Sequence, residues 1–467
     1  MKTKNLNLHF GPASFYADAL WIAIPVMAQA LIQTMVSLID NFMVSGLGDV
    51  KMSGVNITGQ IIFCFMVFLN TICIAGGIYM TQFSGAKDKK GMQQAFCFKI
   101  MMGIIAIALY KFVCLGIPRQ VLGLMVKGNV QADQILDQGE SYIRLIGWAG
   151  IPMMISTVIA SSFREIGQVK APLVISIIAT LVNTFFNWVL IYGNMGFARL
   201  EVRGAAIATI IARLVEMVTF IVYVLVKKPD FAIGILDLFK VNFKLMAEIL
   251  RKGGMVLFSE MLWAFCETVT TALYNGRGGA DVVSGMSASF AIANLFFVAF
   301  GGITTATSVI LGQTLGQGRL EEARQKKSWL LNGAIVFGCI MALLGMLTLL
   351  LVPVVFSNLS YDSRHICSMM VFAMALYMPA WVYVNAQFAV SRAGGDTAMG
   401  MCVDGITNIF MVLPGIFFMA YCTSAGPVFM YVMIKTIDFV KIAIAAVWLK
   451  KEKWLKNLAV ENTQAVV

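Results

Sequence analysis

The chain contains few charged residues. Asp, Glu, Lys and Arg make up 13% of its 467 residues, and 59% of the residues are hydrophobic. A soluble domain has about 25% charged residues, so this composition excludes an ordinary soluble fold and indicates an integral membrane protein. The formal net charge is +11. In a membrane protein such an excess reflects basic loops on the cytoplasmic side, and we expect no nucleic-acid partner.

Histidine and paired cysteines are also scarce. The only histidines are His9 and His365, which makes a metal centre or a Ser–His–Asp catalytic site hard to assemble. None of the nine cysteines belongs to a C-x-x-C pattern, so neither a disulfide framework nor a zinc site is indicated. We therefore expect no enzyme and no metal cofactor. We also expect no separate cleavable signal peptide.

Long apolar runs dominate what remains. Each is long enough to cross a hydrocarbon core of about 30 Å as a helix. The runs fall at 17–45, 55–81, 95–116, 141–163, 172–193, 204–226, 253–276, 285–312, 328–356, 366–391, 397–421 and 426–449. The fold class predicted is therefore an all-α integral membrane protein with twelve transmembrane helices. Most Lys and Arg residues lie on one side of the membrane if both termini are cytoplasmic, which predicts that orientation in the plasma membrane.

The two halves of the chain repeat the same short motifs in the same order. The matches are Ser53-Gly54 with Ser284-Gly285, Gln82-x-x-Gly85 with Gln313-x-x-Gly316, Arg164-x-x-Gly167 with Arg392-x-x-Gly395, and Gly204, Arg213 and Glu216 with Gly426, Lys435 and Asp438. Six spans in each half give both halves the same orientation. We therefore expect two six-helix bundles related by a pseudo-two-fold axis along the membrane normal, with a substrate cavity between them.

The expected domain boundaries follow from this repeat. They are an N-terminal bundle at 1–226, a cytoplasmic linker at 227–252, a C-terminal bundle at 253–449 and a cytoplasmic tail at 450–467. Apolar and basic residues alternate at helical spacing over 229–252, which predicts a segment lying on the cytoplasmic surface. We expect a monomer in contact with membrane lipid.

Asp40 is the only ionisable residue between Leu20 and Ser45. A carboxylate inside a span costs about 2.5–3.5 kcal/mol on insertion scales, so it should face a cavity or the bundle interior. Gln29, Gln33 and Ser37 share one helix face with it. This pattern predicts one wall of a polar chamber in which Asp40 binds a proton or a metal cation such as Na⁺. The alternative is a permanently hydrogen-bonded structural carboxylate.

Several motifs resemble the multidrug and toxic compound extrusion (MATE) family. They include D-N-F-M-V-S-G-L-G at Asp40–Gly48, Q-F-S-G-A-K-D at Gln82–Asp88, F-R-E-I-G-Q-V-K-A-P at Phe163–Pro172, R-G-A-A-I-A-T-I-I-A-R at Arg203–Arg213 and S-R-A-G-G-D-T at Ser391–Thr397. The resemblance covers nearly the whole chain. It implies two six-helix bundles and export of amphipathic organic cations or drugs, driven by an inward gradient of protons or sodium.

Two asparagines are expected beside Asp40. Asn187 lies at about the same depth in the fifth span, and Asn183 lies one turn further in on the same face. One branch of the MATE family carries a second acid at the position of Asn187, so the resemblance leaves proton and sodium coupling both open. Pro25 interrupts the first span, where prolines bend helices. The resemblance implies that this bend accompanies proton loading.

Candidates for binding the substrate or a second cation lie mostly in the second half. Glu260 and Glu267 are seven residues apart and share one helix face. The resemblance implies a cation or substrate role for Glu260, while the alternative is a helix-end carboxylate that is solvated or paired with a basic loop residue. Asp404 and Gln33 are weaker candidates. Some relatives carry a further acid in the tenth span, but Trp381–Asn385 contains none, so no cation site is expected there.

Other intramembrane charges occur in pairs three residues apart, which favours a structural explanation over a functional one. Arg213 with Glu216, and Lys435 with Asp438, should neutralise each other within one helix. Taken together, the sequence predicts a proton- or sodium-coupled antiporter that exports small molecules by alternating access, with no cofactor other than the transported ion. The alternatives are a lipid-linked oligosaccharide flippase, disfavoured by the few basic residues in the N-terminal spans, a membrane-embedded enzyme and a non-transporting receptor.

Overall fold

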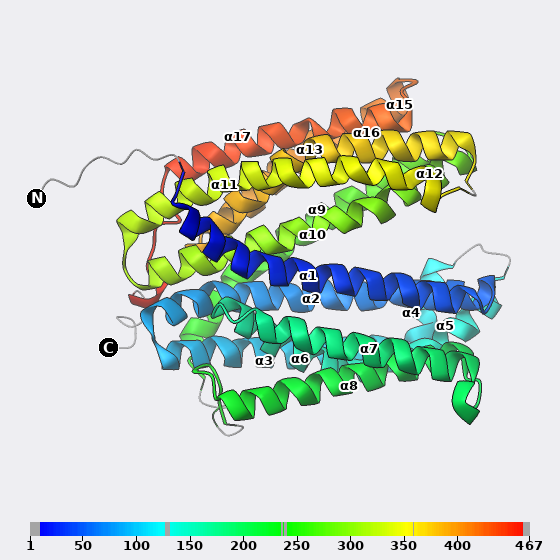
Figure 1. Ribbon diagram of the computed structural model, residues 1–467, viewed down its shortest axis with the longest axis horizontal. Coiled ribbons are helices and arrows are strands. Elements are labelled where there is room, and N and C mark those ends of the chain that lie inside the picture. The colour runs from blue at the N-terminus through cyan, green and yellow to red at the C-terminus, as the bar shows by residue number, and fades with distance from the viewer. Residues whose placement is uncertain (1–9, 127–130, 235–236, 238–240, 358, 461–467) are drawn as a thin grey trace, which may run out of the picture. The chain divides into compact units, whose positions relative to one another are not determined.

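The protein is helical throughout its described length. The computed structural model describes residues 10–126, 131–234, 237, 241–357 and 359–460, and these contain helices, turns and bends but no strand (Figure 1). Eleven helical segments in this part are long and apolar enough to cross a membrane. The backbone of a membrane-spanning segment must satisfy its own hydrogen bonds, which a helix does. The predicted all-α membrane fold is confirmed, with eleven candidate spans and a further helix near the C-terminus.

Eight α-helices precede residue 228. They are α1 (Ala13–Ser45), α2 (Asp49–Ala86), α3 (Lys89–Lys111), α4 (Pro118–Met125), α5 (Ala132–Ile146), α6 (Gly150–Glu165), α7 (Lys170–Tyr192) and α8 (Glu201–Lys227). Local chemistry sets several of these ends. The Asp88 carboxylate accepts a hydrogen bond from the Gly91 amide and caps α3. Pro118 begins α4, and Gly193 ends α7 in the left-handed conformation (φ 76°).

Nine more α-helices follow. They are α9 (Phe243–Asn275), α10 (Ala280–Gly316), α11 (Leu320–Leu347), α12 (Val352–Val355), α13 (Tyr361–Ala393), α14 (Ala398–Thr407), α15 (Leu413–Cys422), α16 (Pro427–Lys435) and α17 (Ile437–Lys450). The last predicted span, 426–449, is therefore two helices rather than one. The break at Thr436 is slight, because its amide donates to the carbonyls of both Val432 and Met433, a pattern typical of a tightened turn.

The described residues group into two compact units. Those of the C-terminal unit fall within Met1–Met27, Thr81–Lys87 and Leu250–Val467, and those of the N-terminal unit within Ala28–Met80 and Asp88–Ile249. Helix α1 contributes to both units, and the division falls just after Met27. The domain boundaries given above stay predictions.

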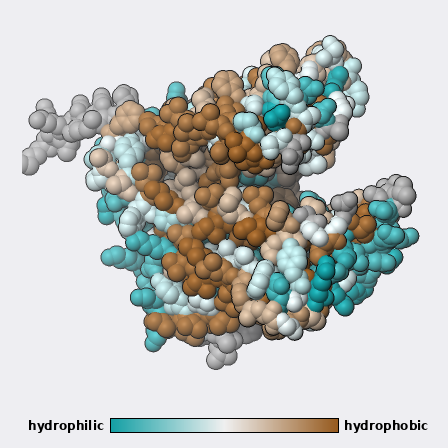
Figure 2. All heavy atoms as spheres, turned by 45° about the vertical axis from the view of Figure 1, so that its right-hand side comes forward, coloured by the Kyte–Doolittle hydropathy of each residue, from teal (hydrophilic) through white to brown (hydrophobic). Residues whose placement is uncertain are grey.

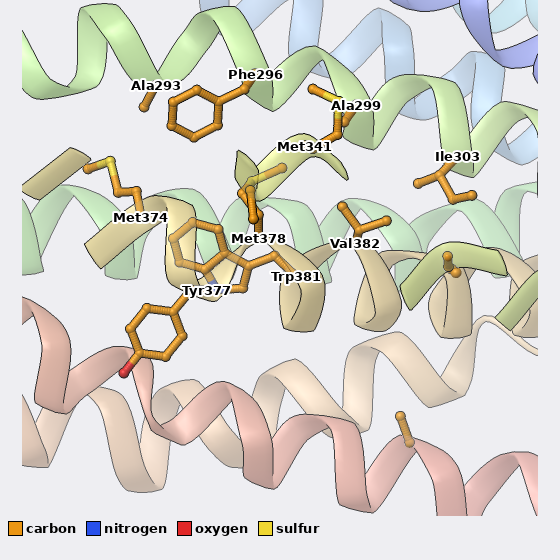
Figure 3. Packing of buried hydrophobic residues seen from close by; sticks show 14 of the residues in the cluster. Ala293, Phe296, Ala299, Ile303, Met341, Met374, Tyr377, Met378, Trp381 and Val382 are labelled. Carbon is orange, nitrogen blue, oxygen red and sulfur yellow. The ribbon is translucent and has the colours of Figure 1, made fainter. Parts of the chain in front are cut away.

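Helix α13 is the central element of the C-terminal unit. It packs along α10 on one side and α11 on another. Figure 3 shows Phe296 of α10 and Met341 of α11 beside Met374, Met378 and Trp381 of α13. Lipid is as apolar as these side chains, so close packing rather than hydrophobic transfer holds such helices together.

The surface of the chain is that of a membrane protein. Large apolar side chains are strongly exposed, among them Phe42 (79%), Phe410 (73%) and Leu350 (72%). Broad hydrophobic areas cover the face shown in Figure 2, and hydrophilic side chains gather at its margins. Monomeric soluble proteins rarely expose apolar patches of this extent, so a lipid environment accounts for them.

The placement of the segment 229–252 on the cytoplasmic surface stays a prediction. Its last part is the beginning of α9, which starts at Phe243. Phe231 is fully buried and contacts the rings of Phe96 and Phe163, with centroids 5.2 and 5.1 Å away. Helical periodicity alone could not show that this aromatic side chain packs against α3 and α6. Residues 235–236 and 238–240 of the segment lie outside the described residues.

The repeated Q-x-x-G motifs contact each other within the C-terminal unit. A Cβ atom on Gly85 would lie 2.1 Å from the backbone oxygen of Gln313, and one on Gly316 would lie 1.9 Å from that of Gln82. The contact is reciprocal, as in an isologous interface between equivalent surfaces. Glycine is required at both positions because the two backbones leave no room for a side chain.

Candidate functional site

Asn187 connects Asp40 to the other predicted asparagine, Asn183. The Asn187 amide Nδ2 donates a hydrogen bond to Asp40 Oδ1 at 2.6 Å and another to Asn183 Oδ1 at 3.2 Å. Asn183 and Asn187 are one turn apart on α7 and are only 6% and 1% exposed. The helical spacing placed Asn187 at the depth of Asp40 and Asn183 one turn further in, and Asn187 contacts both of the others across α1 and α7.

This cluster has more acceptors than donors. Asn187 Oδ1 is buried and has no hydrogen-bond donor among the described residues. Arg213 is near enough to interact electrostatically with Asp40, but its guanidinium forms its ion pair with Glu216 at 2.8 Å. In the described part of the chain no basic side chain forms a salt bridge with Asp40. A carboxylate beside an unsatisfied amide oxygen is suited to a proton or a small hard cation.

The rest of the polar face on α1 is not uniform. Gln29 is buried, where its Nε2 donates to Ser176 Oγ at 2.7 Å and its Oε1 accepts from Arg164 Nη1 at 3.1 Å. Gln29 therefore links α1 to α6 and α7 rather than lining an open chamber. Gln33 is exposed on the same helix, and Ser37 donates to the Gln33 carbonyl at 3.1 Å. Pro25 lies inside α1, which continues through it.

A second candidate site is a cavity of about 810 Å³ in the C-terminal unit. Three acids singled out from the sequence, Glu260, Glu267 and Asp404, all line it. Ligand pockets in proteins measure about 300–1,000 Å³, so a small organic molecule fits. Gln33 belongs to the N-terminal unit and does not line this cavity.

Each acid in the cavity contacts a basic side chain that sequence reasoning did not assign to it. Glu260 forms an ion pair with Arg392 at 2.8 Å, and Glu267 forms one with Lys435. Glu260 is therefore paired with a helical residue, Arg392 in the last turn of α13, and its role in binding stays a prediction.

Lys441 bridges the two remaining carboxylates. Its Nζ lies 3.5 Å from Asp404 Oδ1 and 3.5 Å from Asp438 Oδ1, and Asp404 Oδ2 also accepts from Ser259 Oγ at 2.7 Å. The predicted pairing of Lys435 with Asp438 is therefore wrong, since Lys435 pairs with Glu267 on another helix. In contrast, the matching Arg213–Glu216 pair on α8 forms as predicted.

Aromatic side chains form much of the remaining wall. Trp381 donates its indole N–H to Asp438 Oδ2 at 2.8 Å, and its ring lies 5.8 Å from that of Phe297 in an edge-on arrangement. The Lys435 ammonium lies 5.5 Å from the Tyr431 ring centroid and 5.9 Å from that of Trp381. The tenth-span segment, examined in the sequence only for an acid, thus contributes an aromatic surface.

The sequence contains a pattern that indicates the basic residues of this cavity. Lys435, Asp438 and Lys441 recur every three residues through α16 and α17, so they share one face in the middle of the apolar run 426–449. Intramembrane lysines are rare and face a bundle interior. The spacing allows the pair of Lys441 with Asp438, but it could not show the partners Glu267 and Asp404, which lie on α9 and α14.

The N-terminal unit contains a buried ion pair that the sequence reasoning also missed. Lys99 is completely buried and contacts Glu165, and it donates to the hydroxyls of Ser161 and Ser162 at 3.2 Å each. These contacts satisfy the ammonium group fully. The pair joins α3 to α6.

Replacing Lys99 by Met is expected to destabilise the protein by about 3–5 kcal/mol, because Glu165 would remain as a buried charge without its partner. Thermal unfolding of the purified protein in detergent measures this. The double variant Lys99→Met/Glu165→Met removes both charges and should recover most of the loss. A single variant as stable as the parent would show that the pair contributes nothing.

The candidate ligands for a metal ion are the carboxylate and amide oxygens of the described residues at the two sites. Within the described residues, no group of three or more His, Cys, Asp or Glu side chains is placed to hold a metal ion. Any cation at Asp40 would therefore be held by one carboxylate together with amide oxygens.

This chain is similar in sequence to a known protein family and to several known proteins. The model for the MatE family matches residues 25–189 and 256–418, which is more than half of the chain. The probable multidrug resistance protein NorM of Thermotoga maritima is 23% identical over 326 residues, covering 68% of this chain and 67% of the relative. NorM of Pasteurella multocida, also described as a probable multidrug resistance protein, is 22% identical over 382 residues, covering 80% and 79%.

Solved structures share the fold. A crystal structure of MATE in the bent conformation has a TM-score of 0.83 at 17% identity and covers all of both chains. A transporter of the MOP superfamily from Pyrococcus furiosus has a TM-score of 0.82 at 17% identity, covering 97% of this chain and 98% of its own. Its description states that a reversed polarity of the binding pocket suggests a different function.

Proposed function

Because this chain belongs to the MatE family of transporters, we propose that it is a cation-coupled antiporter that exports small amphipathic organic cations or drugs. The family consists of transporters, so the protein is not an enzyme. One observation carries the proposal of cation coupling. Asp40 lies beside Asn183 and Asn187 with no salt bridge in the described residues and with a buried acceptor left unsatisfied.

Coupling requires only that two ligands prefer different conformations of the carrier. A proton or sodium ion at Asp40 stabilises one state, and the exported compound stabilises the other. The two ligands then weaken each other's binding, and the downhill flow of one drives the other uphill. Asn187 has the central part at this site, because its amide donates to Asp40 and its oxygen remains available to the incoming ion.

The substrate side of the proposal draws on the relatives and on the second cavity. Several relatives are described as multidrug resistance proteins. The C-terminal cavity supplies room, aromatic walls and the acids Glu260, Glu267 and Asp404, and Gln33 faces outward on α1. The chain is a multi-pass membrane protein. We place it in the plasma membrane with both termini in the cytoplasm, following its basic loops.

The deciding experiment uses the purified protein in lipid vesicles. Export of a fluorescent organic cation is followed under an imposed pH gradient and, separately, under an imposed sodium gradient. Acceleration by either gradient supports coupled antiport and identifies the ion. Equal rates with and without both gradients would contradict it.

Pro25→Ala is expected to slow gradient-driven export at least severalfold without preventing folding. The proline removes one backbone hydrogen bond from α1, and it lies two residues before the point at which α1 passes from one compact unit to the other. Solved MATE structures are described as straight and bent conformations. Initial export rates in vesicles test this prediction, and a rate equal to that of the parent would remove Pro25 from the mechanism.

A further inference from the structure

The segment that follows α17, residues 451–460, is firmly attached to the C-terminal unit. Two of its large apolar side chains are buried, with Trp454 1% and Leu458 0% exposed. Gln82, in the last turns of α2, holds its backbone. The Gln82 Nε2 donates to the Lys456 carbonyl at 3.3 Å, and its Oε1 accepts from the Leu458 amide at 2.7 Å. The side chains on the outer surface of this segment are therefore presented from a fixed backbone.

The outer surface of the segment is basic. Four exposed lysines lie in it and at the adjoining end of α17, namely Lys450, Lys451, Lys453 and Lys456. Within the described residues none of the four takes part in a salt bridge. The acid between them, Glu452, pairs instead with Arg324 at 2.6 Å. The four positive charges are therefore left for a partner outside the chain.

Two of these lysines gather on one indole ring. The ammonium groups of Lys451 and Lys453 lie 5.9 and 5.3 Å from the centroid of the Trp448 ring. The ring is held in place because its N–H donates to Asp396 Oδ2 at 2.8 Å. The indole attracts each ammonium group, but the two positive charges repel each other. A phosphate bound to both lysines would relieve this repulsion through charge-assisted hydrogen bonds.

An exposed apolar strip on α17 leads to the same lysines. Val440 and Val447 are 36% and 59% exposed and lie about two turns apart on one helix face. Lys451 follows Val447 by four residues and keeps helical dihedral angles (φ −74°, ψ −5°), so it continues that face. Trp448 lies beside it, and tryptophan is enriched at the level of lipid headgroups. A lipid whose chain contacts the strip would therefore have its phosphate near Lys451.

We propose that Lys451 and Lys453 bind the phosphate group of an anionic phospholipid in the adjoining leaflet. An acyl chain of this lipid lies along the strip of Val440 and Val447. The other two lysines strengthen the attraction to a negatively charged membrane surface, where each basic residue contributes about fivefold in affinity. The site is preformed, because the buried Trp454 anchors the segment. The inference requires only that the chain is embedded in a membrane, and it does not depend on antiport.

Native mass spectrometry of the purified protein in detergent tests the proposal. The protein is mixed with equal amounts of dioleoyl phosphatidylglycerol, which is anionic, and dioleoyl phosphatidylcholine, which has the same chains and no net charge. The measured quantity is the ratio of bound phosphatidylglycerol to bound phosphatidylcholine. Lys451→Gln/Lys453→Gln should lower this ratio at least about fivefold. Lys451→Arg/Lys453→Arg should keep the parental ratio, because a guanidinium group also binds phosphate.

The matched control removes two exposed lysines elsewhere. Lys89→Gln/Lys90→Gln changes the start of α3 and should alter the lipid ratio less than about twofold. All of these positions are exposed, so neither glutamine variant should impair folding. A second control adds an excess of glycerol 3-phosphate, a soluble compound with the same phosphate chemistry. It should leave the bound phosphatidylglycerol in place, because it has no acyl chain to contact α17.

Three outcomes would overturn the proposal. Equal binding of the two lipids by the parent protein would show that no anionic lipid is selected. An equal fall of the ratio in the Lys89/Lys90 and Lys451/Lys453 glutamine variants would remove the assignment to this segment. Displacement of the lipid by glycerol 3-phosphate would identify a site for soluble phosphates. Because no transport is measured, a failure of gradient-driven export would contradict antiport alone.

Discussion

Asp40→Asn is expected to abolish gradient-driven export while leaving the protein folded. An amide is close in size to the carboxyl group and can still accept from Asn187 Nδ2, which lies 2.6 Å from Asp40 Oδ1. It can neither take up a proton nor carry the charge that holds a cation. Coupling between two ligands is typically worth about 5–150-fold in affinity, and the variant loses that factor. Export in vesicles under the driving gradient is the measurement.

The matched control changes another aspartate of the same helix. Asp18→Asn is the same substitution on an exposed residue of α1 and should leave export unchanged. Binding of the exported compound without a gradient should persist in Asp40→Asn, because that variant retains one carrier conformation. Gradient-driven export at the parental rate in Asp40→Asn would refute the coupling role and favour a purely structural carboxylate.

Gly85→Ala is expected to destabilise the protein strongly. The new methyl group would lie 2.1 Å from the backbone oxygen of Gln313 and 2.6 Å from its Cα. Neither atom belongs to a flexible side chain, so α2 and α10 must separate where they cross. Overpacking costs about 1–3 kcal/mol and sometimes more, and a clash with backbone should fall at or above the upper end. Thermal unfolding in detergent, together with the yield of folded protein, measures the loss.

Gly59→Ala provides the comparison within the same helix. A Cβ atom at Gly59 has no neighbour within 4 Å in the described residues, so alanine should be neutral or gain up to about 1 kcal/mol through its helix propensity. Gly316→Ala should reproduce the Gly85 defect, since its methyl group would lie 1.9 Å from the Gln82 backbone oxygen. Similar unfolding temperatures for Gly85→Ala and Gly59→Ala would show that this crossing is not tightly packed.

Much of the fold could be predicted because the membrane restricts the choices. An apolar run of about twenty residues must form a helix in lipid, where unsatisfied backbone groups are costly. The cost of an intramembrane carboxylate likewise marked Asp40, and helical spacing placed Asn187 at its depth and Asn183 one turn further in. These inferences needed only distances along single helices, which the 1.5 Å rise per residue fixes.

Contacts between helices could not be predicted in the same way. The sequence suggested that Lys435 pairs with Asp438, three residues away, yet it pairs with Glu267, 168 residues earlier. The contacts of Phe231 with the rings of Phe96 and Phe163 likewise join residues far apart in the sequence. Each of these outcomes depends on how one helix is rotated and shifted against another, and the hydropathy of the sequence does not predict that rotation.

By itself, the sequence determined that this protein is helical and membrane-embedded with a costly acid in its first span, because lipid penalises unpaired backbone and charge wherever they occur. Only the tertiary structure decided which carboxylates remain available to bind a ligand. Glu260, Glu267 and Asp404 form ion pairs with bases on other helices, whereas Asp40 accepts a hydrogen bond from an amide and forms no salt bridge within the described residues. The reason is that an ion pair requires its two groups within about 4 Å, and helix packing alone sets that distance.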